Sequence, residues 1–369
     1  MAPLRIGLIG CGRIAQLVHL NILTQSAAIK LVALAEADPE RRAEARRRAP
    51  AAIAYASYED LLARPEVEAV VICLPTALHA EVARAAFAAG KHVYLEKPLA
   101  ASLVEGEAVL AAWQRSNLVG MIGFNYRFNA LYQAARRQIG AAAIGAPLGA
   151  QTTFSAAARN LPDWKRQRRT GGSALLDLGS HHLDLVPFLF RRPAVAVAAR
   201  IESRQSEDDT AWIQLELAGG AVVQSLFSLS AVDEDRVTLY GSAGKLSVDR
   251  IHGWNVEYAP AHAATGRLGA FTEQLRRIAG SPYLRERVLA PSSEPSFRTS
   301  LEHFAAVVRN RQLDYPDLSH GYQALALVEA AEAAAKQNQP LRLRNSHNVE
   351  ITAPEHDSYQ PAPLHGALT

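Results

Sequence analysis

Hydrophobic and polar positions divide the chain into two parts with different patterns. Over residues 4–123, short apolar runs alternate with alanine-rich stretches of helical periodicity. This alternation is typical of a parallel sheet built from β-α-β units. Thr76 is expected to cap one of the helices and Gly90 to end it. The expected strands are 4–9, 30–35, 67–74, 92–95 and 118–123, and the expected helices are 14–25, 77–89 and 102–116.

The second pattern begins near residue 147, where apolar and polar positions alternate one by one. Together with turn residues such as Gly219-Gly220, this alternation predicts a mostly antiparallel sheet. Residues 251–296 mix a candidate helix, 269–278, with Pro, Ser and Gly. The expected strands are 211–217, 221–229, 236–240 and 341–343, and the expected helices are 297–310 and 319–337.

The chain is therefore predicted to be an α/β protein of two domains and a tail. The first domain, residues 1–123, is expected to hold a doubly wound parallel sheet, and the second, residues 124–344, the mostly antiparallel one. The 369 residues allow each domain to bury its own core. Residues 345–369 are polar and rich in Pro, Gly and His, so we expect a mobile tail.

Composition and charge exclude several classes of protein. Hydrophobic residues make up 49% and charged residues 20%, as in ordinary globular proteins. The 39 basic and 36 acidic side chains nearly balance, which argues against nucleic-acid binding. Cys11 and Cys73 lie in apolar strand contexts, so we expect buried reduced thiols and no metal site. The sequence has no recognisable leader and no apolar run near the roughly 20 residues of a membrane span, so a cytoplasmic protein is expected.

A glycine pattern follows the first expected strand. Gly10 permits a tight strand-to-helix turn, Gly12 clears side-chain bulk from the path of a pyrophosphate, and Ala15 keeps the next helix close to the strand. The free N–H groups at the start of that helix favour an anion. Glu36 ends the second strand, where such folds place the carboxylate that binds the adenosine ribose. A dinucleotide site is therefore predicted.

A second candidate site lies between Gly171 and Asp184. If this segment is helical, Asp177 and His181 are four residues apart and project from one face, with Asp184 three residues further. An acid and an imidazole would then share one pocket wall, as general acid–base chemistry requires. A buried, hydrogen-bonded Asp and His with a purely structural role is the alternative.

These residues resemble the Gfo/Idh/MocA family of nicotinamide-dependent sugar and inositol oxidoreductases, over residues 4–343. The resemblance implies an N-terminal Rossmann domain, a C-terminal α+β domain with a large open sheet, and a substrate cleft between them. It also implies a homodimer or homotetramer that pairs through the exposed face of that sheet. The motifs that carry it are the glycine pattern, Pro75–His79, Glu96-Lys97-Pro98, Gly123–Phe128 and Asp177-x-Gly179-x-His181-x-x-Asp184.

The resemblance implies an enzyme that transfers a hydride between NAD(P) and a secondary hydroxyl or ketone of a sugar, sugar derivative or inositol. Such oxidation needs a base for the hydroxyl proton. Lys97 and His181 resemble the acid–base pair, and which of them is the base stays open. Asp177 resembles the group that positions substrate and base. Taken alone, Lys97 would more often be a surface lysine after a strand, but its place before Pro98 in the matching tripeptide favours the catalytic role.

Ten residues are expected to contact the cofactor. Thr76 and His79 also have a purely structural interpretation, and Glu96 could simply stabilise its turn. Glu36 favours NAD over NADP because it would repel a 2'-phosphate. Arg41 and Arg42 leave NADP open, although a solvated, ion-paired helix face explains them as well. The expected cofactor residues are Gly10, Gly12, Arg13, Ile14, Glu36, Leu74, Thr76, His79, Glu96 and Lys97.

Substrate contacts are expected from Lys97, Asp177 and His181 and from three further residues, Arg127, Trp164 and Arg166. Arg127 could instead brace the interdomain cleft. Trp164 could stack on a sugar ring or pack in the core. The basic loop around it could bind an anionic group such as a carboxylate or diphosphate, or it could be an exposed surface or a subunit contact. Its cations are Arg159, Lys165, Arg166, Arg168 and Arg169.

Two other functions stay open, and the first of them is within the family's range. One is a redox-neutral glycoside hydrolase that uses bound NAD transiently, and it differs from a dehydrogenase in making no net NADH. The other is a nucleotide-bound sensor without turnover. A sensor has no need to keep Lys97, Asp177 and His181 together, so the sequence favours an enzyme.

Overall fold

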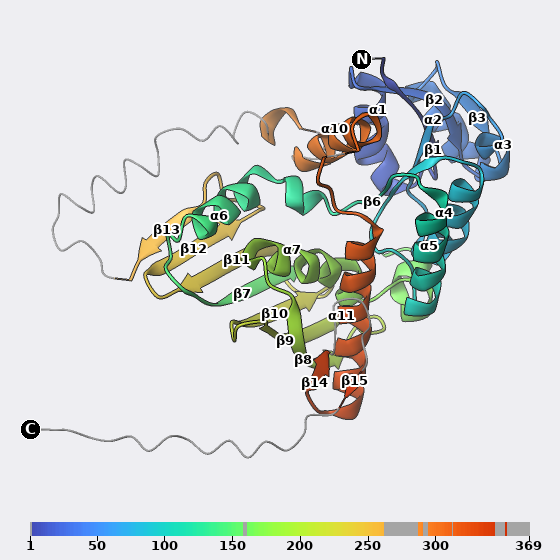
Figure 1. The fold of residues 1–369 in the computed structure, drawn as a ribbon. Coiled ribbons are helices and arrows are strands. Elements are labelled where there is room, and N and C mark those ends of the chain that lie inside the picture. Colours follow the sequence, from blue (N-terminus) through green and yellow to red (C-terminus); the bar gives the residue numbers. More distant parts are fainter. Residues whose placement is uncertain are drawn as a thin grey trace, which may run out of the picture.

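The computed structural model describes residues 2–157, 161–261, 287–290, 294–311 and 313–343, and the backbone of 351–352. Its N-terminal part is a six-stranded parallel sheet in the order β3-β2-β1-β4-β5-β6 (Figure 1). The strand order reverses on either side of β1, which is the doubly wound arrangement. The strands are β1 (Leu4–Ile9), β2 (Ile29–Ala35), β3 (Ile53–Tyr55), β4 (Ala69–Ile72), β5 (His92–Leu95) and β6 (Gly120–Ile122).

The helices that connect these strands begin at residues able to cap them. Asp38 accepts a hydrogen bond from the backbone N–H of Arg41, and Pro39 occupies the first turn, where its missing N–H is harmless. Ser102 and Glu105 form a reciprocal capping box. The helices are α1 (Leu20–Gln25), α2 (Pro39–Arg48), α3 (Tyr58–Leu62), α4 (His79–Ala88) and α5 (Leu103–Ser116).

Two expected helices differ from regular α-helices in their first turns. The helix after the glycine pattern starts at Arg13, close to the expected residue 14, and contains a π-helical segment, Ala15–His19, before α1. Thr76 does not cap α4, since Thr76–Leu78 form a 3-10 turn and no side chain caps the helix. The helical segment therefore starts at Thr76, one residue before the expected start, and its first turn has the tighter 3-10 form. Gly90 has φ +72° just beyond α4, the left-handed conformation expected of a helix end.

The second sheet has nine strands among the described residues, in the order β13-β12-β11-β7-β10-β9-β8-β14-β15. All neighbours are antiparallel except β7 and β10, which run parallel. Along β9, exposed and buried residues alternate as the sequence pattern predicts. The strands are β7 (Pro147–Ser155), β8 (Ala194–Glu202), β9 (Thr210–Leu217), β10 (Val222–Ser228), β11 (Glu234–Gly241), β12 (Gly244–Asp249), β13 (Glu257–Pro260), β14 (Leu341–Leu343) and β15 (Ile351–Thr352).

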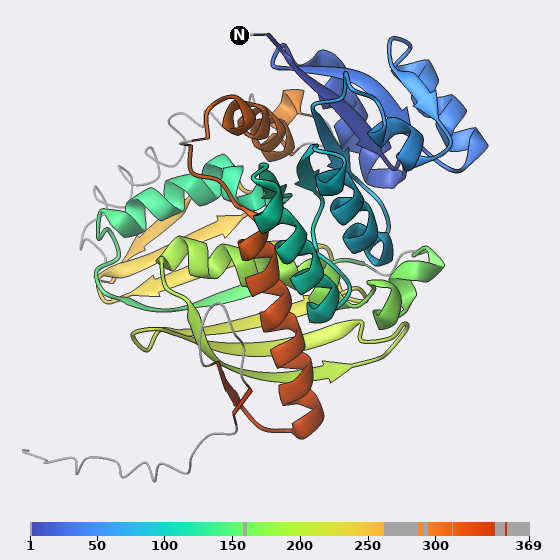
Figure 2. The same ribbon diagram turned by 45° about the vertical axis from the view of Figure 1, so that its right-hand side comes forward.

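Helices cover one face of this sheet. They are α6 (Ala130–Gly140), α7 (Ser180–Phe190) and α11 (Leu318–Gln337), and both ribbon views show them on the same side (Figures 1 and 2). The opposite face exposes Trp212 and Val222. The predicted fold class, a Rossmann-type parallel sheet followed by an α+β domain with a large open sheet, is confirmed.

One late helix packs on the first sheet. Leu301 and Phe304 of α10 (Ser296–Arg309) are buried in the same core cluster as Leu4, Ile6 and Leu8 of β1. The chain then returns along β6, where the backbone N–H of Ile122 donates to Pro316 O, before it enters α11. The packing unit around the first sheet therefore includes a helix from the second predicted domain, which ties the two sheets together.

Three predictions fall on residues outside the described part of the chain. These are the candidate helix 269–278, the side chain of Arg159, and most of the tail 345–369, of which the backbone of Ile351–Thr352 pairs with β14. Cys11 and Cys73 are buried free thiols, as expected. Burial raises the pKa of the Cys11 thiol to about 12, which keeps it protonated.

Candidate active site

The glycine turn lies at the carboxyl end of β1, next to the end of β4. Gly10 has φ +87°, and a Cβ there would lie 2.6 Å from Cys73 O, so only glycine fits this turn. At Gly12 a Cβ would meet nothing within 4 Å. The first turn of the following helix, with Arg13 exposed and Ile14 partly buried, adjoins this open space. The turn therefore offers room and backbone N–H groups for a pyrophosphate.

Glu36 follows β2 and is buried against the same turn. Its Oε2 accepts a hydrogen bond of 2.8 Å from Cys11 N, and its Oε1 accepts from Asp38 N at 3.0 Å. Arg41, half exposed on α2, donates to the same Oε1 at 3.1 Å. Arg42 donates instead to the carbonyls of Glu36 and Ala37. Arg41 is thus ion-paired, as one of its two interpretations predicted, and its partner is Glu36. This ion pair lies where the contact with the adenosine ribose is expected.

The end of β4 brings together Leu74, Thr76 and His79. Thr76 is buried against Gly171, where a Cβ would lie 2.3 Å from the Thr76 Cβ. Both ring nitrogens of His79 contact carbonyls, Nδ1 with Pro98 O at 2.7 Å and Nε2 with Leu74 O at 2.9 Å. His79 therefore joins the end of β4 to the turn that carries Lys97.

That turn, Glu96-Lys97-Pro98, follows β5. Glu96 is buried and its Oε1 lies 2.8 Å from Nε2 of His19, itself fully buried in the π-helical segment. Lys97 points the other way, to the second domain. Its Nζ donates to Asp177 O at 2.6 Å and to Asp177 Oδ1 at 3.0 Å. The Glu96–His19 pair thus anchors the turn on the Rossmann side and Lys97 extends from it across to Asp177.

A second lysine shares this carboxylate. Lys165 Nζ donates to Asp177 Oδ2 at 2.6 Å, so the two ammonium groups hold one oxygen each. The Lys97 and Asp177 side chains are 13% and 16% exposed and that of Lys165 is 29% exposed, so this cluster borders solvent. Although burial alone would raise it, the charges of Lys165 and Lys97 hold the pKa of Asp177 well below its ordinary range. Asp177 is therefore ionised at neutral pH.

His181 lies close enough to this cluster to feel its charges. Burial and then the Lys97 ammonium lower the pKa of His181, while Asp177 opposes that shift. The imidazole is therefore neutral at neutral pH and can accept a proton. Its ring stacks on Tyr126, with 4.3 Å between ring centroids and 18° between the planes.

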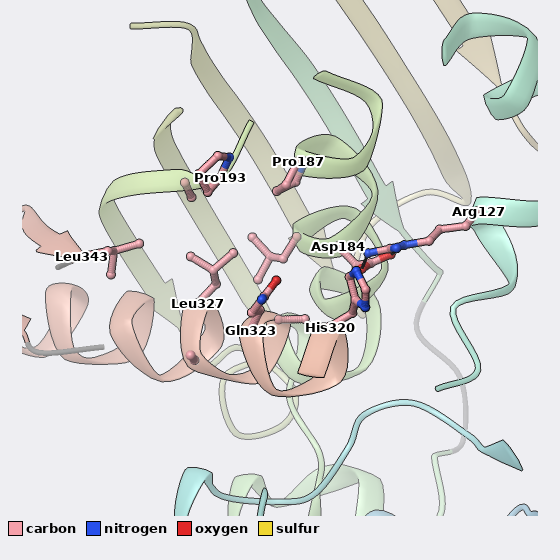
Figure 3. Close-up of a pocket in the computed structure, with 12 residues that line it drawn as sticks. Arg127, Asp184, Pro187, Pro193, His320, Gln323, Leu327 and Leu343 are labelled. Carbon is pink, nitrogen blue, oxygen red and sulfur yellow. Dashed lines mark hydrogen bonds and ion pairs between the residues drawn. The ribbon is translucent and has the colours of Figure 1, made fainter. Parts of the chain in front are cut away.

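The structure separates Asp184 from this cluster. Asp184 accepts from Nε of Arg127 at 2.8 Å and also from its Nη2. The two line a hollow between α7 and α11, with His320 at the same end and Leu327 further along (Figure 3). Lys97, Asp177 and His181 are not among the described residues that line it. The sequence spacing predicted that Asp184 lies on the same helix face as Asp177, and the structure places the two on different faces. The reason is that residues 175–179 form a π-helical segment, which shifts the helical register.

The side chains of the basic loop around Trp164 lie in different environments. Arg168 is anchored, since it pairs with Glu332 of α11 and donates to Ala101 O at 2.9 Å. Arg166 is exposed, and Trp164 is partly buried with the Lys165 ammonium 5.4 Å from its ring centroid. Sequence reasoning placed Lys165 only among these loop cations and missed its contact with Asp177. The available signal was Gly171-Gly172, which lets the loop fold back: a Cβ at Gly172 would lie 2.3 Å from Lys165 O.

Two kinds of feature are absent from the described residues. No helix within them has the length and apolar character to cross a membrane. They also contain no group of three or more His, Cys, Asp or Glu side chains placed to hold a metal ion.

Comparison with known proteins identifies both halves of the chain. The oxidoreductase family model described as an NAD-binding Rossmann fold matches residues 4–124, and that of the family's C-terminal alpha/beta domain matches residues 136–343. A dTDP-3,4-didehydro-2,6-dideoxy-alpha-D-glucose 3-reductase of Streptomyces violaceoruber is 30% identical, over 74% of this chain and 86% of its own length. An inositol 2-dehydrogenase of Rhizobium meliloti is 25% identical, over 92% and 99%.

Solved structures agree with this assignment. A levoglucosan dehydrogenase in complex with NADH and levoglucosan superposes with a TM-score of 0.78 at 24% identity, over 93% of this chain and 100% of that one. At this identity the likeness establishes the fold. The chain therefore belongs to the Gfo/Idh/MocA family of oxidoreductases, with an N-terminal NAD-binding Rossmann fold.

Proposed function

We propose that the protein is a dehydrogenase or reductase that interconverts a secondary hydroxyl and a ketone on a sugar, a sugar derivative or an inositol. The observation that carries the proposal is the cluster in which Lys97, from the Rossmann domain, and Lys165 share the carboxylate of Asp177 beside a neutral His181. Relatives named as inositol dehydrogenase and deoxysugar reductase support the substrate class. The protein is proposed to be cytoplasmic and to pair through the open face of the second sheet.

The residues at the glycine turn fit NAD. The open space at Gly12 and the helix N-terminus at Arg13 and Ile14 suit the pyrophosphate, and Glu36 suits the adenosine ribose. Bound NAD would supply the two-electron oxidant for the carbinol carbon. Leu74, Thr76 and the Glu96-Lys97 turn follow strands β4 and β5, so they are assigned to the nicotinamide half.

The chain's own residues then handle the hydroxyl proton. Asp177 is ionised and orients the Lys97 ammonium, and a neutral imidazole at His181 carries one unprotonated ring nitrogen that can accept a proton. Lys97 and His181 are the proposed acid–base pair. Lys165 is added to the substrate side of the site because it holds the second oxygen of Asp177. Trp164 and Arg166, on the same loop, are proposed to contact the sugar ring and any anionic substituent.

A substrate screen tests the function directly. The purified protein should be assayed for NADH formation with polyols, aldoses, uronic acids, nucleotide sugars and inositols. Net NADH formation with one of these classes is expected. Release of an aglycone without net NADH would instead identify a redox-neutral hydrolase, and binding of NAD without turnover of any substrate would identify a sensor.

Substitution of Gly10 should lower stability, whereas substitution of Gly12 should weaken NAD binding. Gly10→Ala strains a positive φ and brings Cβ against Cys73 O, so it should lower the free energy of unfolding by about 1–3 kcal/mol. Gly12→Ala finds open space, so thermal unfolding should be unchanged. Its NAD affinity should fall about tenfold or more, which corresponds to about 1.4 kcal/mol. Unchanged NAD binding by a folded Gly12→Ala protein would contradict the assigned pyrophosphate position.

Cofactor preference should depend on Glu36 and Arg41. The wild-type protein should have a higher kcat/KM with NAD than with NADP, because the Glu36 carboxylate repels a 2'-phosphate. Glu36→Gln keeps the size of the side chain but leaves Arg41 without its ion pair. The NADP-to-NAD ratio of kcat/KM should then rise about tenfold or more, since juxtaposed like charges cost several kcal/mol. Adding Arg41→Ala should reverse the gain, whereas a wild-type preference for NADP would show that Glu36 is misassigned.

A further inference from the structure

A buried group of charged and polar side chains lies directly behind His181 and has no part in the chemistry proposed above. At its centre is Asp235 of β11, which is fully buried. Tyr126 and Tyr132 donate their hydroxyls to it at 2.6 and 3.2 Å. Arg250, just after β12, donates its Nε at 2.6 Å, and Nε2 of His182 lies 3.1 Å away. Four elements of the second domain thus converge on one carboxylate.

Asp235 and Arg250 are both charged in the folded protein. Although burial opposes it, the Arg250 charge and the His182 contact lower the pKa of Asp235, and Asp235 in turn keeps the pKa of Arg250 raised. A second carboxylate, Glu294, accepts from Arg250 Nη1 at 2.9 Å. Buried charges of this kind are weak evidence for stability, since well-packed apolar residues often serve as well. They do fix the directions of the groups they bind.

Tyr126 connects this group to His181. Its hydroxyl is held by Asp235, the Arg250 guanidinium lies 4.8 Å from its ring centroid, and its ring face stacks on the imidazole. Catalytic histidines are commonly oriented by a hydrogen bond to the second ring nitrogen. Here Nδ1 of His181 is buried and has no hydrogen-bond partner among the described residues. The ring plane of His181 therefore depends on packing, and the closest ring is that of Tyr126.

We propose that Tyr126, fixed by Asp235 and Arg250, is a positioning residue that sets the ring plane of His181 for proton transfer. This inference rests on the proposed function, because Tyr126 can position His181 for catalysis only if His181 acts on the substrate. Misplacement of a reacting group by about 1 Å can cost about 100-fold in rate. The Tyr126 ring is held in place by its hydroxyl, and it stacks flat on the imidazole of His181. This contact restricts both the tilt of the imidazole plane and its sideways displacement.

The charges around His181 come from several elements. Lys97 and Asp177 face it from the site, and Asp235 and Arg250 act on it from behind Tyr126. Tyr126 is the titratable ring stacked on His181, and the ring centroid of His182 lies 6.3 Å from that of Tyr126. Burial is the largest cause of the lowered pKa of His181. Removing the ring that covers one face should admit water and move that pKa back toward the ordinary value of about 6.5.

The test compares Tyr126→Phe, which keeps the stacked ring, with Tyr126→Leu, which removes it, in the full-length enzyme with NAD and its best alcohol. Tyr126→Leu should lower kcat about 100-fold with little change in KM, and should move the acidic limb of the kcat pH profile to higher pH. Tyr126→Phe should lose less activity and keep the wild-type profile. Tyr322→Leu is the control for losing a buried tyrosine, since Tyr322 on α11 bonds Glu107 away from this group.

A spectroscopic measurement makes the test independent of activity. In protein labelled at histidine ring carbons, the His181 signals, assigned with His181→Asn, should carry the ring-current shift of a stacked aromatic in wild type and Tyr126→Phe. In Tyr126→Leu the part of the shift due to Tyr126 should be lost, which leaves the smaller contribution of Phe154, whose ring centroid lies 5.9 Å from that of His181. If that variant does not fold, absence of the shift in the wild-type protein overturns the inference by itself.

Two results separate failure of this inference from failure of the proposed function. If Lys97→Met and His181→Asn retain wild-type kcat, the acid–base assignment fails whatever Tyr126 does. If those two variants are inactive while Tyr126→Leu keeps the kcat and pH profile of wild type, only the positioning role is wrong.

Discussion

Lys97→Met is expected to lower kcat for alcohol oxidation by about 100- to 10,000-fold, the usual contribution of a positioned acid or base. The reason is geometric: Lys97 is the group that the Rossmann domain extends to Asp177, with Nζ 2.6 Å from its carbonyl and 3.0 Å from its carboxylate. NAD affinity, measured by fluorescence titration, should change far less than kcat. The surface substitution Lys336→Met on α11 is the matched control.

A second substitution at the same position separates charge from proton transfer. Lys97→Arg keeps a cation beside Asp177 but does not release a proton at neutral pH. It should therefore stay nearly as inactive as Lys97→Met. Recovery of activity in Lys97→Arg would show that the ammonium acts only through its charge. A larger loss in His181→Asn than in Lys97→Met would identify the histidine as the base.

Loss of the lysine should leave the fold intact. Methionine fills a similar volume, and Asp177 keeps its contact with Lys165. The carboxylate is thus not left unpaired, which is the usual source of a large destabilisation. The thermal unfolding temperature of Lys97→Met should therefore be close to that of wild type. If it is, the loss of kcat can be attributed to the site and not to a damaged fold.

The Rossmann half could be predicted from the sequence because its signals are local. Gly10 needs a positive φ, Ser102 and Glu105 form a capping box within one turn, and each strand is a short apolar run. Parallel strands then bring their carboxyl ends to one edge without further information. Glu36 and Lys97 were placed correctly at that edge for this reason, although their roles stay predictions.

The contacts that connect distant segments could not be predicted in the same way. Lys165 was recognised as a cation, but its contact with Asp177 depends on a loop that folds back on Gly171-Gly172. Asp235 lies on a strand with ordinary alternation, and nothing local shows that two tyrosines and an arginine converge on it. Side-chain pairing across elements is set by tertiary packing, which sequence periodicity does not encode.

Helical periodicity also misled at the active-site segment. A regular helix would place Asp177, His181 and Asp184 along one face, at spacings of four and three. The π-helical segment Leu175–Gly179 adds a residue to one turn, so Asp184 turns toward Arg127 while Asp177 faces the two lysines. Such segments are frequent at functional sites, and the sequence gives no simple sign of them.

Asp177→Asn is expected to affect both stability and activity, because it removes the anion that two ammonium groups share. Lys97 and Lys165 would then face each other across a neutral amide, and we expect the free energy of unfolding to fall by about 1–3 kcal/mol. kcat should fall about 100-fold or more, since the orientation of Lys97 and the contact to substrate are lost together. Denaturant unfolding and steady-state kinetics measure the two effects.

A double substitution distinguishes these two effects of Asp177. Lys165→Met in the Asp177→Asn protein removes one of the two facing charges, so part of the lost stability should return, as a double-mutant cycle would record. The kcat should not return, because Lys97 still lacks the carboxylate that orients it. Recovery of kcat together with stability would mean that Asp177 serves only to neutralise the lysines, and its role as a group that positions base and substrate would have to be abandoned.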